Sequence, residues 1–369
     1  MDKNRGGQKR RFAFLIHPRN GKDIGHLMGQ KVGIGGRLGR RLVPEWLTPL
    51  LWKGLRLCCK VVVCGRCVVS EEVEGFVIGL PMTAAEMVAG PRKQVMGEIV
   101  DAVLFAREKL GCSVVGLGAY TAPLSLNGKA VADDPRINCA VTHGDALSAA
   151  SAVAAVRRAA DLRGLDIERS TVAVVGGYGL VGRAAAILTG ELNPAGMILT
   201  GPNSGKLRKV AAEMAGYRGK VACSTDNRSA GEADIVVLCT TATGDVIGPG
   251  DLKQDAVVID MAQPPNMSRE VCCRRPDVLR LDGGFLHTGI APGFEMGPPA
   301  GVTLACFTET MLLAMAGDRD HHVGPVDIGY ARLIWKRAVE SGYDLAPFTS
   351  FGKPVLTRSR EGREGRGEG

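Results

Sequence analysis

Aromatic residues are scarce in this sequence, at 5% of 369 residues, and no long apolar run is present. The nearest such run, residues 301–317, is interrupted by Glu309 and falls short of the roughly 18 residues that cross a bilayer. The basic N-terminus leads into only five apolar residues, 12–16, whereas a signal peptide needs about 7–15. These absences argue against a membrane-spanning or exported protein, and we expect a cytoplasmic one.

Cysteine is present in an odd number, 11, which without an export signal favours reduced thiols over a disulfide framework. Four cysteines lie within ten residues: Cys58, Cys59, Cys64 and Cys67. Cys-x-x-Cys is a common half of a zinc site, but no second half with histidines follows. We expect no metal here and favour small buried thiols, while the sequence leaves metal binding by this cluster open.

The net charge is +8, and basic residues gather in one segment. Residues 31–66 carry eight Lys or Arg and one acid, and residues 44–57 have apolar side chains at helical spacing. A core-facing helix with a solvated basic face is favoured over a docking surface. Charge alone does not choose among nucleic acid, anionic lipid and an acidic protein. The basic side chains in question are Arg37, Arg40, Arg41, Lys53 and Arg56.

The high glycine content, 50 residues, and strands alternating with helices predict an α/β protein. We expect an N-terminal α/β substrate domain and then a Rossmann-like NADP-binding domain with a C-terminal helix. Strands are expected near 12–16, 61–69 and 114–117, with a helix over 83–110. The expected divisions are a flexible start at 1–11, domains at 12–165 and 166–320, a helical segment at 321–350 and a disordered tail at 351–369.

A turn at Thr142–Asp145 precedes an alanine-rich helix, 146–160. Such a small-faced helix packs closely against a neighbour or lets a ligand approach its start. His143 in this turn is either a satisfied structural histidine, the more usual case, or a ligand-facing catalytic residue.

The most informative local pattern is a β-branched strand, 171–175, that runs into a glycine loop and a helix. Both Gly-x-x-Gly-x-x-Gly and Gly-x-Gly-x-x-Gly spacings are present, and a second strand follows at 197–200. Glycine lets backbone N–H groups approach a pyrophosphate at the helix start. The predicted cofactor-binding residues of this loop are Gly176, Gly177, Gly179, Leu180, Val181 and Gly182.

The segment after the second strand favours NADPH as the cofactor. NAD sites usually carry Asp or Glu there for the ribose 2′-hydroxyl, and this sequence has none. Ser204, Lys206 and Arg208 are expected to hold a 2′-phosphate instead. Later strands at 234–239 and 256–260 place Thr240 and Thr241 toward the nicotinamide by the switch-point rule.

A helix is expected to open at Gly301, after Pro298 and Pro299, with Cys306 one to two turns inside it. At that depth the helix dipole lowers a thiol pKa only modestly. From spacing alone, a buried core cysteine is favoured over a nucleophile.

The order of these motifs resembles the long-chain acyl-ACP reductases, which form fatty aldehydes from thioesters of acyl carrier protein (ACP). The resemblance spans about residues 12–348, and Ala305-Cys306-Phe307 is its most telling part. The other matching segments are 12–17, 25–27, the 142–145 turn, 171–182, 233–237, 258–260, 282–284 and 341–343, the last expected within a C-terminal helix.

From its position in the turn before a helix, His143 is a weaker catalytic candidate, and the resemblance implies that Cys306 is the acyl-accepting cysteine. Its thiolate would attack the thioester, and NADPH would then deliver hydride to form an aldehyde. The implied partner is acyl-ACP or acyl-CoA, with no nucleic acid and with peripheral membrane contact left open. Chain length, the preferred carrier, the fate of the aldehyde and the oligomeric state are not given by the sequence.

Three alternatives remain at this point. A shikimate- or quinate-type NADP dehydrogenase shares the two-domain plan but needs a Lys–Asp pair that we cannot place. A glutamyl-tRNA reductase-like enzyme would carry its cysteine in the N-terminal domain. A non-catalytic regulator that binds NADPH or acyl groups could use the same fold.

Overall fold

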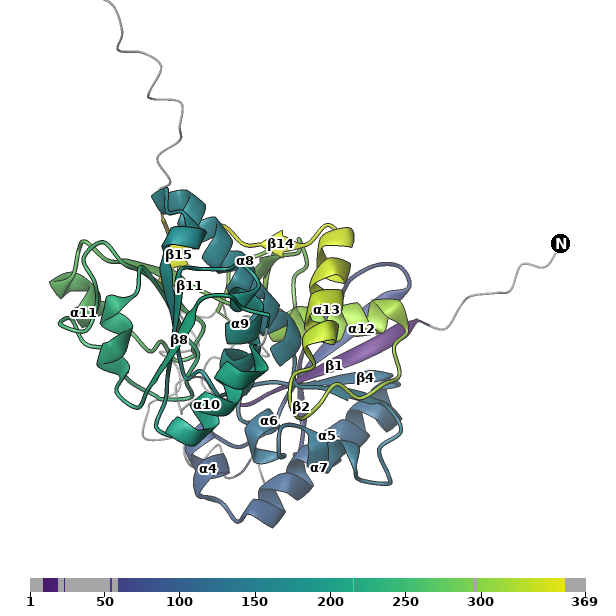
Figure 1. Ribbon diagram of the computed structural model, residues 1–369. Coiled ribbons are helices and arrows are strands. Elements are labelled where there is room, and N and C mark those ends of the chain that lie inside the picture. Colours follow the sequence, from purple (N-terminus) through teal and green to yellow (C-terminus); the bar gives the residue numbers. More distant parts are fainter. Residues whose placement is uncertain are drawn as a thin grey trace, which may run out of the picture. The chain divides into compact units, whose positions relative to one another are not determined.

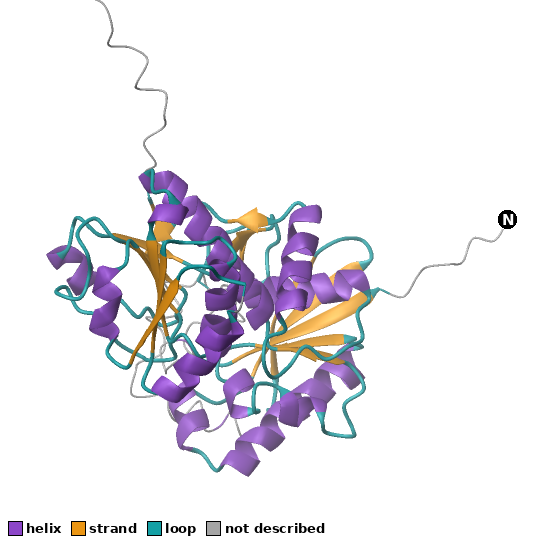
Figure 2. Ribbon diagram, viewed as in Figure 1, coloured by secondary structure: helices purple, strands orange, loops and turns teal. Residues whose placement is uncertain are grey.

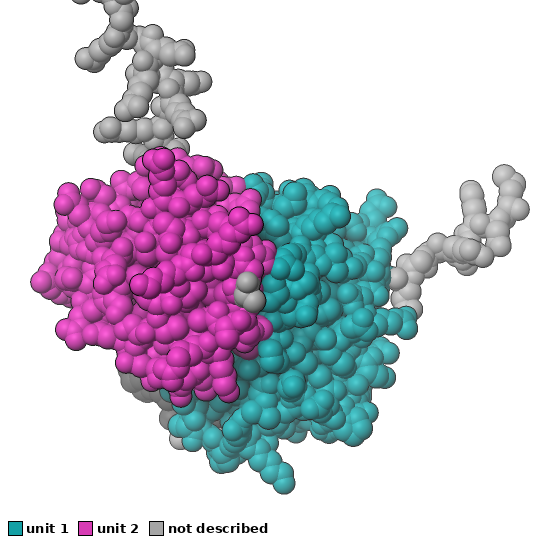
Figure 3. Space-filling model, in the orientation of Figure 1, with its two compact units in different colours: residues 1–148, 285–344 teal, residues 149–284, 345–369 magenta. Residues whose placement is uncertain are grey.

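The computed structural model describes residues 9–18, 23, 54, 59–214, 216–294 and 297–355. The chain forms two compact units, residues 1–148 with 285–344 and residues 149–284 with 345–369 (Figure 3). The basic side chains at Arg37, Arg40, Arg41, Lys53 and Arg56, together with Cys58, lie outside the described residues.

The first unit is built on a five-stranded sheet of order β2-β3-β1-β4-β5 (Figures 1 and 2). β1 is parallel to both β3 and β4, β4 is parallel to β5, and only β2 pairs antiparallel, with β3. The strands are β1 (Arg10–Ile16), β2 (Val62–Val68), β3 (Val73–Gly79), β4 (Val114–Leu117) and β5 (Ala140–Thr142).

The central strand β1 is covered on both faces. Ala13 and Leu15 belong to a buried cluster with the apolar side of α5, whereas Phe12 and Phe14 contact Phe307 of α12 edge to face. This explains why residues 12–15 form an unbroken apolar run, which is typical of parallel strands buried on both sides. The remaining elements of this unit are α4 (Ala84–Ala89), α5 (Arg92–Leu110), α6 (Thr121–Leu124), α7 (Lys129–Ala132), β12 (Phe285–His287), β13 (Val302–Leu304), α12 (Ala305–Ala316) and α13 (Ile328–Glu340).

The second unit contains a six-stranded sheet of order β11-β10-β9-β6-β7-β8, parallel throughout. Numbered from its first strand, this order is 6-5-4-1-2-3, the arrangement of dinucleotide-binding Rossmann domains. The strands are β6 (Thr171–Val175), β7 (Gly196–Thr200), β8 (Lys220–Ser224), β9 (Ile235–Leu238), β10 (Val257–Asp260) and β11 (Leu279–Asp282).

Helices and short strands complete the second unit: α9 (Leu180–Gly190), α10 (Ser204–Glu213), α11 (Arg269–Arg274), the 3₁₀ turns η1 (Ile167–Arg169) and η2 (Asn227–Glu232), β15 (Thr349–Ser350) and β16 (Lys353–Pro354). Two elements lie where the chain passes between units, α8 (Asp145–Arg163) and β14 (Asp344–Leu345). The predicted α/β class is confirmed, with the Rossmann-like sheet in the second unit.

Several boundaries differ from those expected. Residues 285–320 were assigned to the cofactor domain but belong to the first unit, because α12 packs its Phe307 on β1. The single helix expected over 83–110 is two, since Pro91 cannot continue α4. The last helix ends before Ser341, so 341–343 follow it. The expected disordered tail begins too early, because Phe351 covers the Arg280 side chain and β16 follows.

Candidate active site

Cys306 is the second residue of α12, not one to two turns inside a helix. Residues 302–304, expected to be helical, instead form β13, which pairs antiparallel with β12. No side chain caps α12, so its first-turn N–H groups lack intrahelical partners. The N–H groups of Phe307 and Cys306 are directed at the thiol and favour its ionised form.

The start of α12 lies at the carboxyl ends of the parallel strands of the first unit. Phe307 packs on β1, and at the other end of α12 the Arg10 side chain donates to the Met315 carbonyl, 2.5 Å away. The helix, which lies beside β1 (Figure 1), therefore runs antiparallel to that strand. Its start brings Cys306 to the edge where β5 ends. Ligands of open α/β sheets bind at this edge.

Gly144, just after β5, lies directly against Cys306. A Cβ atom on Gly144 would be 2.3 Å from the Cys306 Cα and 2.4 Å from its Cβ, and the Gly144 φ is +75°. Both observations require glycine at this position. The turn at 142–145 and the cysteine therefore form one site, although Asp145 and Cys306 are 161 residues apart in the sequence.

Glu309, one turn after Cys306, was noted in the sequence only as a break in an apolar run. It is fully buried, and its two oxygens accept from the Thr142 hydroxyl at 2.6 Å and from the Leu147 N–H at 2.8 Å. The Tyr330 hydroxyl lies 3.5 Å from the same carboxylate. Glu309 thereby joins α12 to the 142–145 turn and to the first turn of α8. A lone acid within an otherwise apolar helix is the signal that could have found it.

His143 uses both ring nitrogens inside the protein. Its Nε2 lies 3.0 Å from the Gly324 carbonyl and so carries the hydrogen, while Nδ1 accepts the Asp145 N–H at 3.1 Å. The Asp145 Oδ2 is 3.3 Å from the same Nδ1, a contact that is favourable only when one of the two groups carries an extra proton. His143 thus contacts both the backbone N–H and the carboxyl group of Asp145, and through these contacts it orients Asp145.

A second histidine at this edge, His17, is also fully engaged. Its Nδ1 donates to the Pro18 carbonyl at 3.0 Å, and its Nε2 accepts the Tyr120 N–H at 3.1 Å. Burial is the main cause that lowers the pKa of His17. This neutral histidine ties the end of β1 to the segment after β4, and its contacts are structural.

Two titratable groups of this site have strongly shifted pKa values. Burial raises the pKa of Asp145 to about 6, with His143 opposing the rise and Glu309 adding to it. Burial, followed by the charge of Asp145, raises the pKa of the Cys306 thiol to about 12. Before substrate binds, the thiol therefore holds its proton at neutral pH, whereas Asp145 is mostly ionised, with about a tenth of it still protonated.

In the second unit the predicted glycine loop has the geometry of a phosphate-binding turn. Gly176 has φ +82°, and a Cβ on Gly182 would come 2.2 Å from the Gly176 carbonyl oxygen. Gly179 begins α9 without a side-chain cap, so the N–H groups of Leu180, Val181 and Gly182 lack intrahelical acceptors. A Cβ on Gly177 would come 3.2 Å from the Leu199 Cβ, so this position also leaves little room for a side chain. This arrangement fits the pyrophosphate of a dinucleotide.

The residues expected to hold a 2′-phosphate follow β7 on α10. Asn203 caps this helix through the Lys206 N–H, which puts Ser204 and Lys206 in the first turn. The Lys206 ammonium lies 5.4 Å above the Tyr178 ring. Arg208 is exposed and lies one turn after Ser204. Its charge opposes the rise that burial causes in the pKa of Cys223 on β8. Ser204 and Lys206 are thus at the helix start, while Arg208 is farther along the helix.

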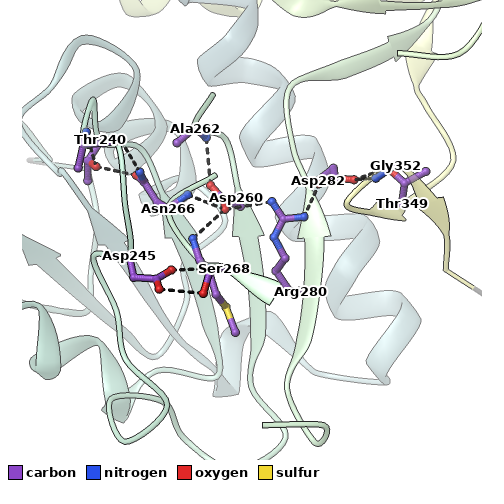
Figure 4. Close-up of polar contacts among 12 residues, drawn as sticks. Thr240, Asp245, Asp260, Ala262, Asn266, Ser268, Arg280, Asp282, Thr349 and Gly352 are labelled. Carbon is purple, nitrogen blue, oxygen red and sulfur yellow. Dashed lines mark hydrogen bonds and ion pairs between the residues drawn. The ribbon is translucent and has the colours of Figure 1, made fainter. Parts of the chain in front are cut away.

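Thr240 takes part in a polar network at the carboxyl ends of β9 to β11 (Figure 4). Its hydroxyl donates to the Asn266 side chain at 2.6 Å, and Asn266 donates to the Ala242 carbonyl. Buried Asp260 accepts from the N–H groups of Ala262 and Asn266. The neighbouring Thr241 is exposed. The loops after β9 and β10 are therefore fixed to each other, where the switch-point rule places the nicotinamide.

Arg280 anchors the same network from β11. Its side chain is 1% exposed and pairs with Asp260 at 3.0 Å and with Asp282. Asp282 also accepts from the Thr349 hydroxyl at 2.6 Å and the Gly352 N–H at 2.8 Å (Figure 4). The C-terminal hairpin is thereby held on the edge strand of the cofactor sheet.

Among the described residues, no group of three or more His, Cys, Asp or Glu side chains is arranged to hold a metal ion. Cys59, Cys64 and Cys67 take part in no disulfide within the described residues, and burial raises the pKa of Cys67 to about 11. No helix within the described ranges is long and apolar enough to cross a membrane.

A comparison with curated proteins identifies a relative whose sequence is matched by this chain over most of its length. A long-chain acyl-[acyl-carrier-protein] reductase of Synechococcus elongatus is 31% identical over 246 residues, 63% of this chain and 70% of that protein. The chain belongs to the family of this reductase. With the Rossmann sheet of the second unit, this makes it an oxidoreductase of the NAD(P)-binding type. No family model matches the sequence.

Other similarities are weaker. An aminotransferase, PigE, of Serratia sp. is 25% identical over 297 residues, and this chain spans 33% of that longer protein. Among solved structures, shikimate 5-dehydrogenase from Listeria monocytogenes is 10% identical, with 91% of this chain and 99% of that chain covered and a TM-score of 0.37. Glutamyl-tRNA reductase from Methanopyrus kandleri is 20% identical, with 53% and 47% covered and a TM-score of 0.30. Both TM-scores are too low to bear on function, and the fold rests on the strand order described above.

Proposed function

We propose that this protein reduces a long-chain acyl thioester, carried on ACP or CoA, to a fatty aldehyde with NADPH and with Cys306 as the covalent acyl acceptor. The observation that carries the proposal is the position of Cys306. In a member of this reductase family, a cysteine stands at an uncapped helix start and at the ligand-binding edge of a parallel sheet.

In the first half-reaction, the Cys306 sulfur forms a bond to the acyl carbon and the carrier thiolate leaves. The thiol proton passes to the leaving sulfur, so that the products are an acyl-Cys306 thioester and the free carrier thiol. The uncapped N–H groups at the start of α12 can stabilise the developing oxyanion as well as the thiolate. This offsets part of the effect of burial on the thiol.

In the second half-reaction, the acyl group on Cys306 is reduced to an aldehyde and the cysteine is regenerated. NADPH would supply the hydride for this step. The chain's own contribution is a phosphate-binding turn at Gly176–Gly182 and the paired loops after β9 and β10, held together by Asn266. Ser204, Lys206 and Arg208 favour the 2′-phosphate, since residues 201–208 contain no acid.

The test is to compare wild type with Cys306→Ala and Cys306→Ser in the presence of acyl-ACP and NADPH. Both variants should fold and bind NADPH, yet lose aldehyde formation by at least about 10³-fold, since a hydroxyl is far harder to ionise than a thiol. Without NADPH, the wild type should gain the acyl mass on the peptide that contains Cys306. The other ten cysteines are the internal control.

Three results would contradict the proposal. Cys306→Ala that keeps most of its activity would exclude covalent catalysis at this residue. Acyl mass on the peptides that contain Cys58, Cys59, Cys64 or Cys67 would move the nucleophile to that N-terminal cluster. NADPH binding with no acyl adduct and no aldehyde would favour a non-catalytic regulator.

A further inference from the structure

We infer that Asp145 is the general acid of the reduction step: its carboxyl group donates a proton to the oxygen of the acyl group held on Cys306. The inference rests on the proposed function and assigns the residue that handles the proton. In the sequence, Asp145 is the last residue of the turn that contains His143, and no catalytic role was predicted for it.

The position of Asp145 follows from the backbone around it. Gly144, its neighbour, is in direct contact with the Cys306 Cα and Cβ, so the first residue of α8 lies beside the cysteine. The Asp145 side chain is 23% exposed, whereas that of His143 is 4% exposed. Of the two, Asp145 is the group that a substrate on Cys306 can contact. His143 fixes it from behind through the Asp145 N–H.

The surroundings of Asp145 keep a proton available near neutral pH. The described titratable groups that face it are His143 in its own turn and Cys306 and Glu309 on α12. Glu309 is a buried carboxylate, so its negative charge, with burial, opposes ionisation of Asp145. At a pKa of about 6, about a tenth of Asp145 remains protonated at pH 7. An acid with a pKa near the working pH is effective in both directions of proton transfer.

The chemical balance of the step is simple. Hydride adds to the acyl carbon, the C=O π electron pair moves to oxygen, and that oxygen takes the Asp145 proton to give a hemithioacetal on Cys306. On collapse, the hydroxyl proton returns to the Asp145 carboxylate and the C–S bond breaks. The aldehyde leaves, and the Cys306 thiolate takes a proton from water. No further oxidant or reductant is needed.

Replacement of Asp145 by Asn has effects of opposite sign on two reactions. The negative charge of Asp145 raises the pKa of the thiol, so Asn should increase the thiolate fraction and speed alkylation of Cys306. The same replacement removes the acid and should slow reduction of the acyl group. A merely structural role would slow both reactions or neither.

The experiment uses full-length wild type, Asp145→Asn and the control Asp133→Asn, an exposed acid of the same unit. Iodoacetamide alkylation of Cys306 is followed by peptide mass spectrometry. The acyl enzyme is then formed without NADPH, and its single-turnover reduction is timed after NADPH addition between about pH 5 and 9. Thermal unfolding checks the fold, and Asp145→Ser is the second variant if Asn does not fold.

We expect Asp145→Asn to be alkylated several-fold faster than wild type at alkaline pH and reduced about 10²-fold more slowly at neutral pH. Wild-type reduction should decline above about pH 6, and the variant should lack this decline. An acyl enzyme of Asp145→Asn that is reduced at the wild-type rate overturns the acid role alone. Absence of any acyl adduct on wild-type Cys306 overturns the proposed function and the acid role together.

Discussion

At the scale of single residues, the contact between Gly144 and Cys306 decides whether the site can form. Two separate constraints meet at Gly144, its positive φ and the absence of room for a side chain. A left-handed conformation costs a non-glycine residue about 1–2 kcal/mol, and overpacking adds about 1–3 kcal/mol. The two constraints can be separated because Gly342, in the same unit, has φ +78° but nothing within 4 Å of an added Cβ.

We therefore predict that Gly144→Ala lowers the free energy of unfolding by about 3 kcal/mol, and Gly342→Ala by about 1 kcal/mol. Urea unfolding of both variants gives the comparison. Equal losses of unfolding free energy would mean that backbone conformation alone accounts for glycine at position 144. Cys306 would then shift to make room for the added methyl group without a further loss of stability.

Asp145 also makes a prediction about stability. Its pKa is raised in the folded protein, so between about pH 4 and 6 the native state binds more protons than the unfolded state. The free energy of unfolding should consequently fall as pH rises through this range. Asp145→Asn should remove that fall and be more stable than wild type at pH 7, by a margin of the order of 2 kcal/mol.

The measurement is urea unfolding of both proteins at about pH 4 and pH 7. The difference between variant and wild type should be small at the acid end and favour the variant at the neutral end. A difference in unfolding free energy that does not change with pH would show that folding does not raise the pKa of Asp145.

At the scale of elements, parallel strands were predictable and tertiary pairing was not. β1, β4, β6 and β10 were found from short apolar runs, because parallel strands covered on both faces leave such runs. β13 was missed because its three residues are strand only through pairing with β12. That error hid the true position of Cys306. The glycine loop was recognisable because its constraints are local, whereas Glu309 and Asp145 gain their surroundings from segments far apart in the sequence.

The start of α10 gives the cofactor prediction. Lys206→Ala and Arg208→Ala should each weaken NADPH binding about 10- to 100-fold while leaving NADH nearly unchanged, as expected for loss of a charge-assisted contact to a phosphate. Lys206, in the first turn, should show the larger effect. Fluorescence titration with the two nucleotides measures both constants. Equal losses for NADPH and NADH would remove these residues from the 2′-phosphate.

The C-terminal hairpin makes a prediction for truncation. Ending the chain after Leu345 removes the Thr349 and Gly352 contacts to Asp282 and the Phe351 ring over Arg280, so a buried ion cluster loses its cover. This truncation should destabilise the protein by several kcal/mol, since partners of buried charges are costly to remove. Ending it after Val355 keeps all of these contacts and should change the unfolding curve little, which makes it the matched control.

At the scale of the whole molecule, the net charge of +8 predicts that association with an acidic carrier protein would depend on salt concentration. Acyl carrier proteins are acidic, so their encounter with a basic protein is accelerated at low ionic strength and slowed as salt screens the charges. Added salt should therefore raise KM for acyl-ACP more than for a short acyl thioester that lacks the protein carrier. Parallel salt dependences would show that the charge plays no part in carrier recognition.

The division of the chain also has a consequence for its synthesis. The first unit is made of residues 1–148 and 285–344, with most of the second unit inserted between them. During synthesis, all six strands of the nucleotide-binding sheet are translated before α12. Until then Phe12 and Phe14 lack the Phe307 ring that covers them. The nascent chain thus exposes one aromatic face for the time needed to make the inserted unit, a window in which chaperone binding or aggregation competes with folding.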